Sequence, residues 1–248
     1  MDRKRRTPGL RREEVAARAG VSVTWYTWLE QGRGGPPSGE VLERLARALE
    51  LDDAGREILF FLGHQRPPPI KPVSPSDVAP ALQRVLDAMP MTPAYVKTLT
   101  WDIIGWNAAA AVLNNFSSLQ AEERNVLRRL FTQPTLRNLL ADWEIEARFA
   151  VAAFRLDAAR AGDNPKVAAL VAELQAISPD FRRLWAENET RRHGIHIRRI
   201  QHPTAGPLTF ECSLLHVESG EGLSILVYTP ASPEDARAIS ELLSASPR

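Results

Sequence analysis

Basic side chains are concentrated at one end of the chain, in a pattern that could bind a polyanion. Residues 1–18 contain seven Lys or Arg against three Asp or Glu, whereas the whole chain has a formal net charge of only +1. Because attraction to phosphate decays over a Debye length of about 10 Å, this local excess matters more than the total. The segment predicts either contacts to nucleic-acid phosphates, made by Arg5 and Arg6, or a solvated tail.

The stretch GVSVTWYTWLEQGR at 20–33 could present a surface that reads base edges. In a helix each residue advances by about 100°, so Tyr26 and Leu29 share one face and pack inward. The opposite face is formed by Val23, Thr24, Thr27 and Trp28. Threonine hydroxyls can hydrogen-bond to bases, and backbone N–H groups together with the Ser22 hydroxyl can hold a phosphate. The alternative is that the tryptophans are partly buried under the loop at 33–39.

The side chains that could catalyse a reaction or hold a metal are scattered. His193 and His196 would lie on opposite faces of a strand, and they are either metal ligands or surface histidines beside Arg198. The carboxylates within 142–146 alternate along an expected helix, which disfavours an acid–base pair. Cys212 alternates with apolar residues, as a buried thiol does. We therefore expect no catalytic site, no metal site and no cofactor, and we expect that the protein is not an enzyme.

A proline-rich stretch at 66–80 divides the elements that must position these side chains. Six of its fifteen residues are proline, which cannot donate a backbone hydrogen bond and favours an extended spacer. The stretch separates an N-terminal module, 1–65, from a C-terminal domain, 81–248. We treat it as a linker between two folded units.

The N-terminal module is predicted to be all-α. A helical pattern over 10–19 ends at Gly20, and Ser22 is placed to cap a second helix. Ser38 is placed to cap a third helix, and a hydrophobic helix closes the module at 52–64. Short helices joined by a tight glycine turn match a helix-turn-helix pattern.

The C-terminal domain is predicted to be α+β. β-branched and aromatic residues around a turn predict a hairpin at 94–107, and residues 119–192 read as helices. The best of these helices follows Asn164, with apolar residues on one face as far as Ile177. Alternating residues predict strands within 195–229, and a last helix is expected at 232–244. We expect an antiparallel sheet with a helical face.

The composition indicates a cytoplasmic protein. A single cysteine allows no internal disulfide, which fits a reducing compartment. The sequence has no run of 18 apolar residues and no apolar segment behind its N-terminal charges, so we expect no membrane partner.

The segment RRTPGLRREEVAARAGVSVTWYTWLEQGR resembles the signature of MmyB-like transcriptional regulators. Three further segments are similar to the same family: ADWEIEARFAVAAFR, SPDFRRLWA and HPTAGPLTFECSLL. The resemblance implies a bacterial Xre-type helix-turn-helix module followed by a PAS-like ligand-binding domain. It also implies that Val23, Thr24, Thr27 and Trp28 read double-stranded DNA. Xre-type domains normally carry a further helix before this signature, so we expect that the first helix of the module is missing here.

The resemblance implies a small apolar, fatty-acyl-like ligand for the C-terminal domain. Strands at 95–106 and 208–228 would form one wall of its pocket, and helices at 142–154 and 181–185 the other. Trp106 and Trp143 are expected to contact the ligand, and Asn107 and Arg191 to hold its polar end. The alternative is that the aromatic residues form a solid core.

These observations predict a ligand-responsive DNA-binding transcriptional regulator. A homodimer is expected, because one helix-turn-helix contacts few base pairs and the apolar run at 58–62 exceeds what a small module can bury. The alternative is a helix-turn-helix-derived interaction or ligand-binding protein that no longer binds DNA.

Overall fold

Two compact units, Met1–Pro69 and Ile70–Arg248, make up the chain. The computed structural model describes residues 9–64, 68, 78–187, 196–218 and 222–245. The division between the units falls inside the proline-rich stretch at 66–80. Arg5, Arg6 and Arg191 lie outside the described residues.

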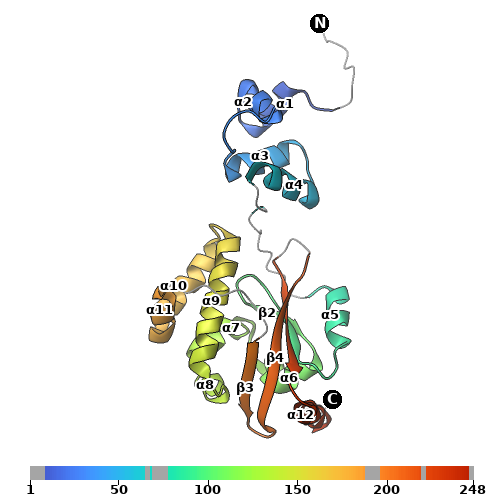
Figure 1. Cartoon of the computed structure of the whole chain (residues 1–248), viewed down its shortest axis with the longest axis vertical. Coiled ribbons are helices and arrows are strands. Elements are labelled where there is room, and N and C mark those ends of the chain that lie inside the picture. The colour runs from blue at the N-terminus through green and yellow to red at the C-terminus, as the bar shows by residue number, and fades with distance from the viewer. Residues whose placement is uncertain (1–8, 65–67, 69–77, 188–195, 219–221, 246–248) are drawn as a thin grey trace. The chain divides into compact units, whose positions relative to one another are not determined.

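The N-terminal unit is helical, as the sequence predicts (Figure 1). Its described helices are α1 (Arg12–Ala19), α2 (Val23–Glu30), α3 (Gly39–Ala48) and α4 (Asp53–His64). Gly20 ends α1 with φ 64°, a left-handed conformation that costs glycine little, and its N–H reaches the carbonyls of Ala16 and Ala17. The Ser22 and Ser38 side chains accept hydrogen bonds from Trp25 N and Val41 N, so both predicted caps are confirmed.

The core of this unit is small and apolar. A buried cluster joins α1, α2 and α3 through Val15, Ala16, Ala19, Tyr26, Leu45 and Ala48. In α4, Phe60 is buried, but Ile58, Phe61 and Leu62 are 60%, 51% and 80% exposed. The run at 58–62 therefore leaves a stripe of large apolar side chains uncovered within the described unit.

The C-terminal unit is built on a five-stranded sheet. Its strands are β1 (Ala94–Lys97), β2 (Ile103–Trp106), β3 (His196–His202), β4 (Gly206–His216) and β5 (Ser224–Pro230). They pair in the order β2-β1-β5-β4-β3, antiparallel throughout. The predicted hairpin and the antiparallel sheet are confirmed, and the α+β class with them; the PAS-like label remains a prediction.

Helices connect and flank these strands. They are α5 (Pro80–Asp87), α6 (Ala108–Asn114), α7 (Val126–Thr132), α8 (Pro134–Leu139), α9 (Trp143–Ala161), α10 (Pro165–Ile177), α11 (Pro179–Ala186) and α12 (Pro233–Ala245), with short 3-10 turns at Phe116–Ser118 and Ala121–Glu123. Asn164 caps α10 as predicted, but Ile177, the last residue of the expected apolar face, is 55% exposed. Among the described segments, no helix is both long enough and apolar enough to span a bilayer.

The two faces of the sheet pack against different partners. One large core joins the inner face to α6, α7, α9, α10 and α11, whereas α5 covers the outer face through a second core. Alternate residues of β1 face opposite sides: Tyr95 belongs to the first core, and Ala94 and Val96 to the second. Figure 1 shows α5 on one side of the sheet and α8 and α9 on the other. A side chain at Gly105 would meet Val78 at 2.7 Å, so α5 and the residues before it approach the sheet closely.

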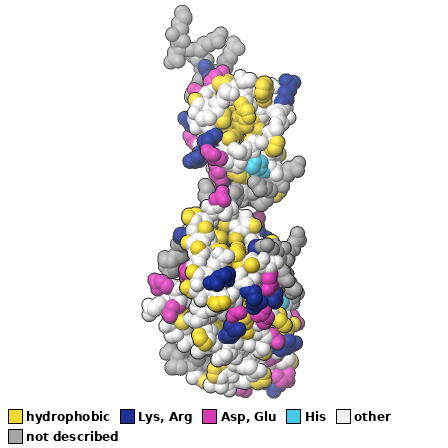
Figure 2. Space-filling view, turned by 90° about the vertical axis from the view of Figure 1, so that its left-hand side faces the viewer, with side chains coloured by type: hydrophobic (Ala, Val, Ile, Leu, Met, Phe, Trp, Pro, Cys, Tyr) yellow, Lys and Arg dark blue, Asp and Glu magenta, His cyan; other side chains and the backbone are white. Residues whose placement is uncertain are grey.

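The helices of this unit carry several exposed ion pairs on their surface. Arg183 and Arg148 both contact Glu144, at 2.9 and 3.0 Å, and Arg137 contacts Asp180 at 2.7 Å. Figure 2 shows acidic and basic side chains intermingled on this unit. Exposed pairs of this kind contribute little each to stability, about 0–1 kcal/mol.

Candidate ligand pocket and nucleic-acid interface

Helix α2 presents the predicted reading face to solvent. Tyr26 is buried, while Trp28 is 51% and Val23 39% exposed, and Thr24 is exposed as well. Trp25 is half-buried and packs against the small core. The face is thus accessible, and one of the two tryptophans stands on it.

Local hydrogen bonds limit what the cap residue Ser22 and the face residue Thr27 can offer to DNA. The Ser22 Oγ accepts from Trp25 N at 3.1 Å, which leaves its hydroxyl hydrogen to donate. The Thr27 hydroxyl donates to the Val23 carbonyl at 2.8 Å, so its remaining capacity is a lone pair and a methyl group. Glu30, which closes α2, forms an ion pair with Arg12 of α1 and holds the two helices together.

The described residues of the N-terminal unit do not carry a net positive charge. Residues 9–64 contain seven Arg, no Lys and nine Asp or Glu. The positive excess of the N-terminal unit lies at residues 3–6, which contain three Arg and one Lys. Attraction to phosphate therefore depends on residues that precede the described helices.

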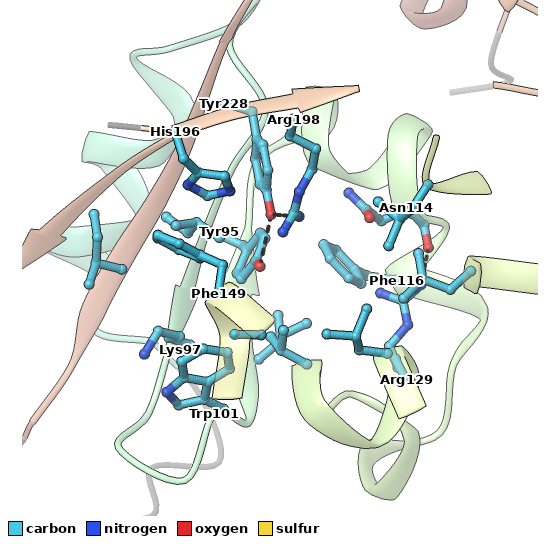
Figure 3. A pocket seen from close by; sticks show the side chains of 18 residues that line it. Tyr95, Lys97, Trp101, Asn114, Phe116, Arg129, Phe149, His196, Arg198 and Tyr228 are labelled. Atoms are coloured by element: carbon cyan, nitrogen blue, oxygen red, sulfur yellow. Dashed lines mark hydrogen bonds between the residues drawn. The ribbon is translucent and has the colours of Figure 1, made fainter. Parts of the chain in front are cut away.

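A pocket lies between the inner face of the sheet and the helices α7 and α9 (Figure 3). It encloses a cavity of about 60 Å³ within an empty region of about 700 Å³ that includes open solvent. Apolar and aromatic side chains form most of its lining, including Ile103, Phe116, Leu130, Phe149 and Leu226. Its polar lining consists of Tyr95, Lys97, Asn114, Arg129, His196, Arg198 and Tyr228. An apolar pocket with a few convergent polar groups is typical of a small-molecule site.

A hydrogen-bonded chain of buried groups crosses the pocket wall. Arg198 donates to the Glu146 carboxylate at 2.6 and 2.9 Å and to the Tyr228 hydroxyl at 2.5 Å. Burial would raise the pKa of Glu146, but Arg198 and His196 outweigh burial and lower that pKa to about 2. Burial raises the pKa of Tyr95 and of Tyr228, so both hydroxyls stay protonated.

One hydroxyl proton of the pair Tyr95 and Tyr228 makes no hydrogen bond to a described residue. Their hydroxyl oxygens are 3.1 Å apart and share one hydrogen bond, and Arg198 can only donate to Tyr228. Two hydroxyl protons are present and one lies between the oxygens, so the other has no acceptor among the described residues. Both side chains are buried and line the pocket, which therefore offers a hydrogen-bond donor to a ligand.

Arg129 is a buried cation without a described carboxylate partner. Its guanidinium donates to the Gln133 side chain at 3.3 Å and to the Asn114 carbonyl at 3.2 Å, and it lies 5.0 Å from the Phe116 ring. Burial lowers the pKa of Arg129. The other two pocket cations each have a carboxylate: Asp157 for Lys97 and Glu146 for Arg198. The pocket thus has one excess positive charge among its described groups.

Three of the four predicted ligand contacts do not line this pocket. Asn107 caps α6 and accepts from Ala94 N, while its amide donates to three backbone carbonyls. This amide is committed to structure and does not line the pocket. Trp143 donates to the Leu130 carbonyl and packs in the core behind the lining. Trp106 packs on Phe116 and is also absent from the lining, so this pocket does not support these three positions as ligand contacts, and their role stays a prediction.

The interpretation of the histidine region also needs correction. Arg198 is largely buried, with 19% of its side chain exposed, and His196 lines the pocket with its ring 4.0 Å from that of Phe149. Across the described ranges no group of three or more His, Cys, Asp or Glu could hold a metal. Cys212 is a buried thiol as predicted, and burial raises its pKa to about 12.

Sequence reasoning missed the polar residues of the pocket, although one signal was present. Lys97 follows Tyr95 by two residues in a strand, so both must share a face. A lysine on the inner face of an otherwise apolar strand indicates a buried polar site. No comparable local signal marks Arg129 or Glu146, which lie on helices that also carry exposed charges.

The two units together define a class of protein: a DNA-binding regulator that responds to a ligand. A family model described as MmyB-like transcription regulator ligand binding domain matches residues 78–242, and a helix-turn-helix domain model matches residues 3–59. The chain belongs to the family of MmyB-like transcription regulators. No curated protein matches the chain.

Proposed function

We propose that this regulator binds specific sites in duplex DNA through α2 and works in the cytoplasm without catalytic activity. Base edges would meet Val23, Thr24, Thr27 and Trp28, and phosphates would meet Ser22, Arg5 and Arg6. The exposed face of α2 supports the first set. The charge count supports the dependence on residues 3–6, because the rest of the unit has more carboxylates than arginines.

Substitutions at Thr27 and at Arg5 and Arg6 distinguish contacts to base edges from contacts to phosphates. Thr27→Ala removes the methyl and the remaining lone pair from the α2 face, so it should cost about 1–3 kcal/mol on the preferred site only. Arg5→Ala with Arg6→Ala should weaken binding to all duplexes and flatten the salt dependence by about one unit per lost phosphate contact. A selected operator and a scrambled duplex would be titrated over a salt series. Equal losses from Thr27→Ala on both duplexes would show that the reading face is misassigned.

The effector we propose is an apolar carboxylic acid, of the fatty-acyl kind that the family resemblance implies. The observation that carries this proposal is the buried guanidinium of Arg129, which forms no ion pair with a described carboxylate. A carboxylate held by Arg129 would also accept a hydrogen bond from the tyrosine hydroxyl that has no acceptor among the described residues. The cavity of about 60 Å³ holds only a small part of an acyl chain, so the tail would extend into the open part of the pocket.

Native mass spectrometry of the freshly purified full chain tests this effector. A lipid-sized adduct, or titration by decanoic acid, supports the proposal. Arg129→Met keeps most of the apolar stem of the side chain but removes the guanidinium and its charge, and it should weaken decanoate binding at least tenfold. Exposed Arg237→Met is the matched control. An empty protein that decanoic acid does not titrate would refute the effector.

We also propose a homodimer, joined at least in part through α4. Ile58, Phe61 and Leu62 form an exposed apolar stripe at i, i+3 and i+4 spacing, which is one helix face. Dimers of this class place two reading helices about 34 Å apart on one face of DNA. Phe61→Ser with Leu62→Ser should give monomers in sedimentation at tens of micromolar while the unit stays folded. A wild-type chain that is monomeric with and without DNA would contradict the dimer.

The rival function is a helix-turn-helix-derived ligand-binding protein that no longer binds DNA. The excess of carboxylates within residues 9–64 is the observation that favours it. A genomic-fragment selection with the full chain decides between the two. Enrichment of no sequence, together with retained ligand binding, would favour the rival.

A further inference from the structure

We propose that the effector carries a second polar group, a neutral hydroxyl or carbonyl oxygen, which accepts a hydrogen bond from Lys97. The inference rests on the proposed function, because it concerns the same pocket, and it narrows the effector from a plain apolar acid to an oxygenated one. The Lys97 ammonium and its surroundings carry the argument.

Lys97 has more donors than the described residues accept. Its Nζ donates to Asp157 Oδ2 at 3.0 Å and lies 4.3 Å from the centre of the Trp101 ring. An ammonium group has three N–H donors, and these two neighbours account for two of them. The side chain is 3% exposed and lines the pocket. The third N–H therefore has no acceptor among the described residues.

The protein maintains this arrangement at a cost. Trp101 has φ 64°, a conformation that is strained for a bulky side chain. A hydrogen-bonded turn fixes it: Thr98 and Thr100 pair with each other, and Asn125 donates to the Thr100 carbonyl and to Asp102. The strained position brings the indole N–H to Asp157 at 2.8 Å and the ring over Lys97. A hydrocarbon tail makes no hydrogen bonds, so binding such a tail would require neither the buried charge of Lys97 nor the strained backbone of Trp101.

One acid group cannot serve both Lys97 and Arg129. Figure 3 shows Arg129 and Asn114 on one side of the pocket and Lys97 with Trp101 on the other. A carboxylate held by Arg129 thus leaves the Lys97 donor unused. The ligand needs a second acceptor at the Lys97 side.

The charge at Lys97 selects a neutral acceptor over a second anion. Asp157 already neutralises Lys97 and also accepts from Trp101 and, at 3.5 Å, from Arg160. A second carboxylate would meet the Asp157 charge at close range. A hydroxyl or oxo group accepts from Lys97 without that repulsion. The class of effector is therefore a hydroxy or oxo carboxylic acid.

Matched acids test the proposal on the full-length wild-type chain. Decanoic acid is compared by calorimetry with hydroxydecanoic acids that bear the hydroxyl at carbon 3, 5, 8 or 10. A hydrogen bond to a charged donor should make at least one isomer bind about 10-fold to 100-fold more tightly than decanoic acid. If decanoic acid binds and no isomer binds more tightly, this inference fails and the proposed function stands. If none of the acids binds, both fail.

A double variant locates the second contact. Lys97→Met with Asp157→Asn removes both charges and leaves an amide oxygen to accept from Trp101. It should bind decanoic acid as the wild type does and lose the preference for the hydroxylated isomer. Arg129→Met should show the opposite pattern, with weaker binding of every acid and a retained preference. A preference that survives in the double variant would overturn the assignment to Lys97; if that variant does not fold, the isomer comparison on the wild type decides alone.

Discussion

The two units place their charges in opposite ways. Within the described part of the N-terminal unit, every Arg, Asp and Glu lies at least partly at the surface, and the core is apolar. The C-terminal unit buries Lys97, Arg129, Glu146 and Asp157. Charge on the outside suits a unit that meets a partner at its surface, whereas charge on the inside suits one that encloses a small molecule. The difference shows which residues to change when each activity is tested.

Removing the buried carboxylate should have the largest effect. Glu146→Gln leaves the Arg198 guanidinium buried without its counterion, which costs about 3–5 kcal/mol of unfolding free energy. Glu144→Gln is the matched control on the same helix, because its carboxylate is exposed and its ion pairs contribute about 0–1 kcal/mol. Urea unfolding followed by hydrogen exchange reports the two units separately. If the two substitutions lowered the free energy of unfolding equally, the buried Glu146 would contribute no more to stability than the exposed Glu144.

Acid should destabilise the C-terminal unit first. Folding lowers the pKa of Glu146 from 4.5 to about 2, so the ionised group stabilises the fold above pH 4.5. That contribution, at most about 3 kcal/mol, is lost as pH falls from 4.5 towards 2. The described N-terminal unit has no buried carboxylate and should lose less over this range. Thermal unfolding at half-unit pH steps checks the prediction, and Glu146→Gln should remove most of the slope.

Loss of a helix cap should affect only the N-terminal unit. Ser22→Ala removes the acceptor for Trp25 N, which costs about 1 kcal/mol, whereas Ser22→Gly costs a few tenths. Hydrogen exchange of peptides from 9–64 should quicken, and peptides from the sheet should be unchanged. A change that spreads to the sheet would show that the units do not unfold independently.

The smallest expected effect is on the single thiol. Cys212 is buried in the domain core, and burial raises its pKa to about 12, so almost no thiolate forms near neutral pH. A maleimide reagent should leave the native chain unmodified and label it once in urea. Rapid native labelling would mean that the core around β4 opens readily.

Local features were predictable because their causes are local. The caps at Ser22 and Asn164 and the stop at Gly20 each depend on groups within four residues. Asn107 was correctly recognised as a helix cap, but it does not line the pocket, where it was expected to hold a ligand. Its amide is taken up by carbonyls of Leu86, Met89 and Thr92, 15 to 21 residues away, which no local pattern reveals.

The pocket depends on contacts that span most of the domain. Tyr95 and Tyr228 are 133 residues apart in sequence and share a hydrogen bond. Arg198 and Glu146, 52 residues apart, meet only because β3 and α9 pack together. Periodicity assigns such residues to strands and helices, but the partner of a buried charge follows from tertiary packing. Aromatic content suggested a pocket, and its polar residues emerged only from the fold.

The alternation along β1 has a consequence for how a bound effector could be sensed. Tyr95 and Lys97 line the pocket, while Ala94 and Val96 touch the layer formed with α5, the first helix after the proline-rich stretch. A structural change caused by a ligand in the pocket would therefore pass from one residue of β1 to its immediate neighbour in the chain. A shift of the Tyr95 backbone would also move Ala94 and Val96, against which α5 packs. A single strand thus separates the pocket from the layer formed with α5, and a ligand that shifted β1 would reach both faces of the sheet without a relay of side chains.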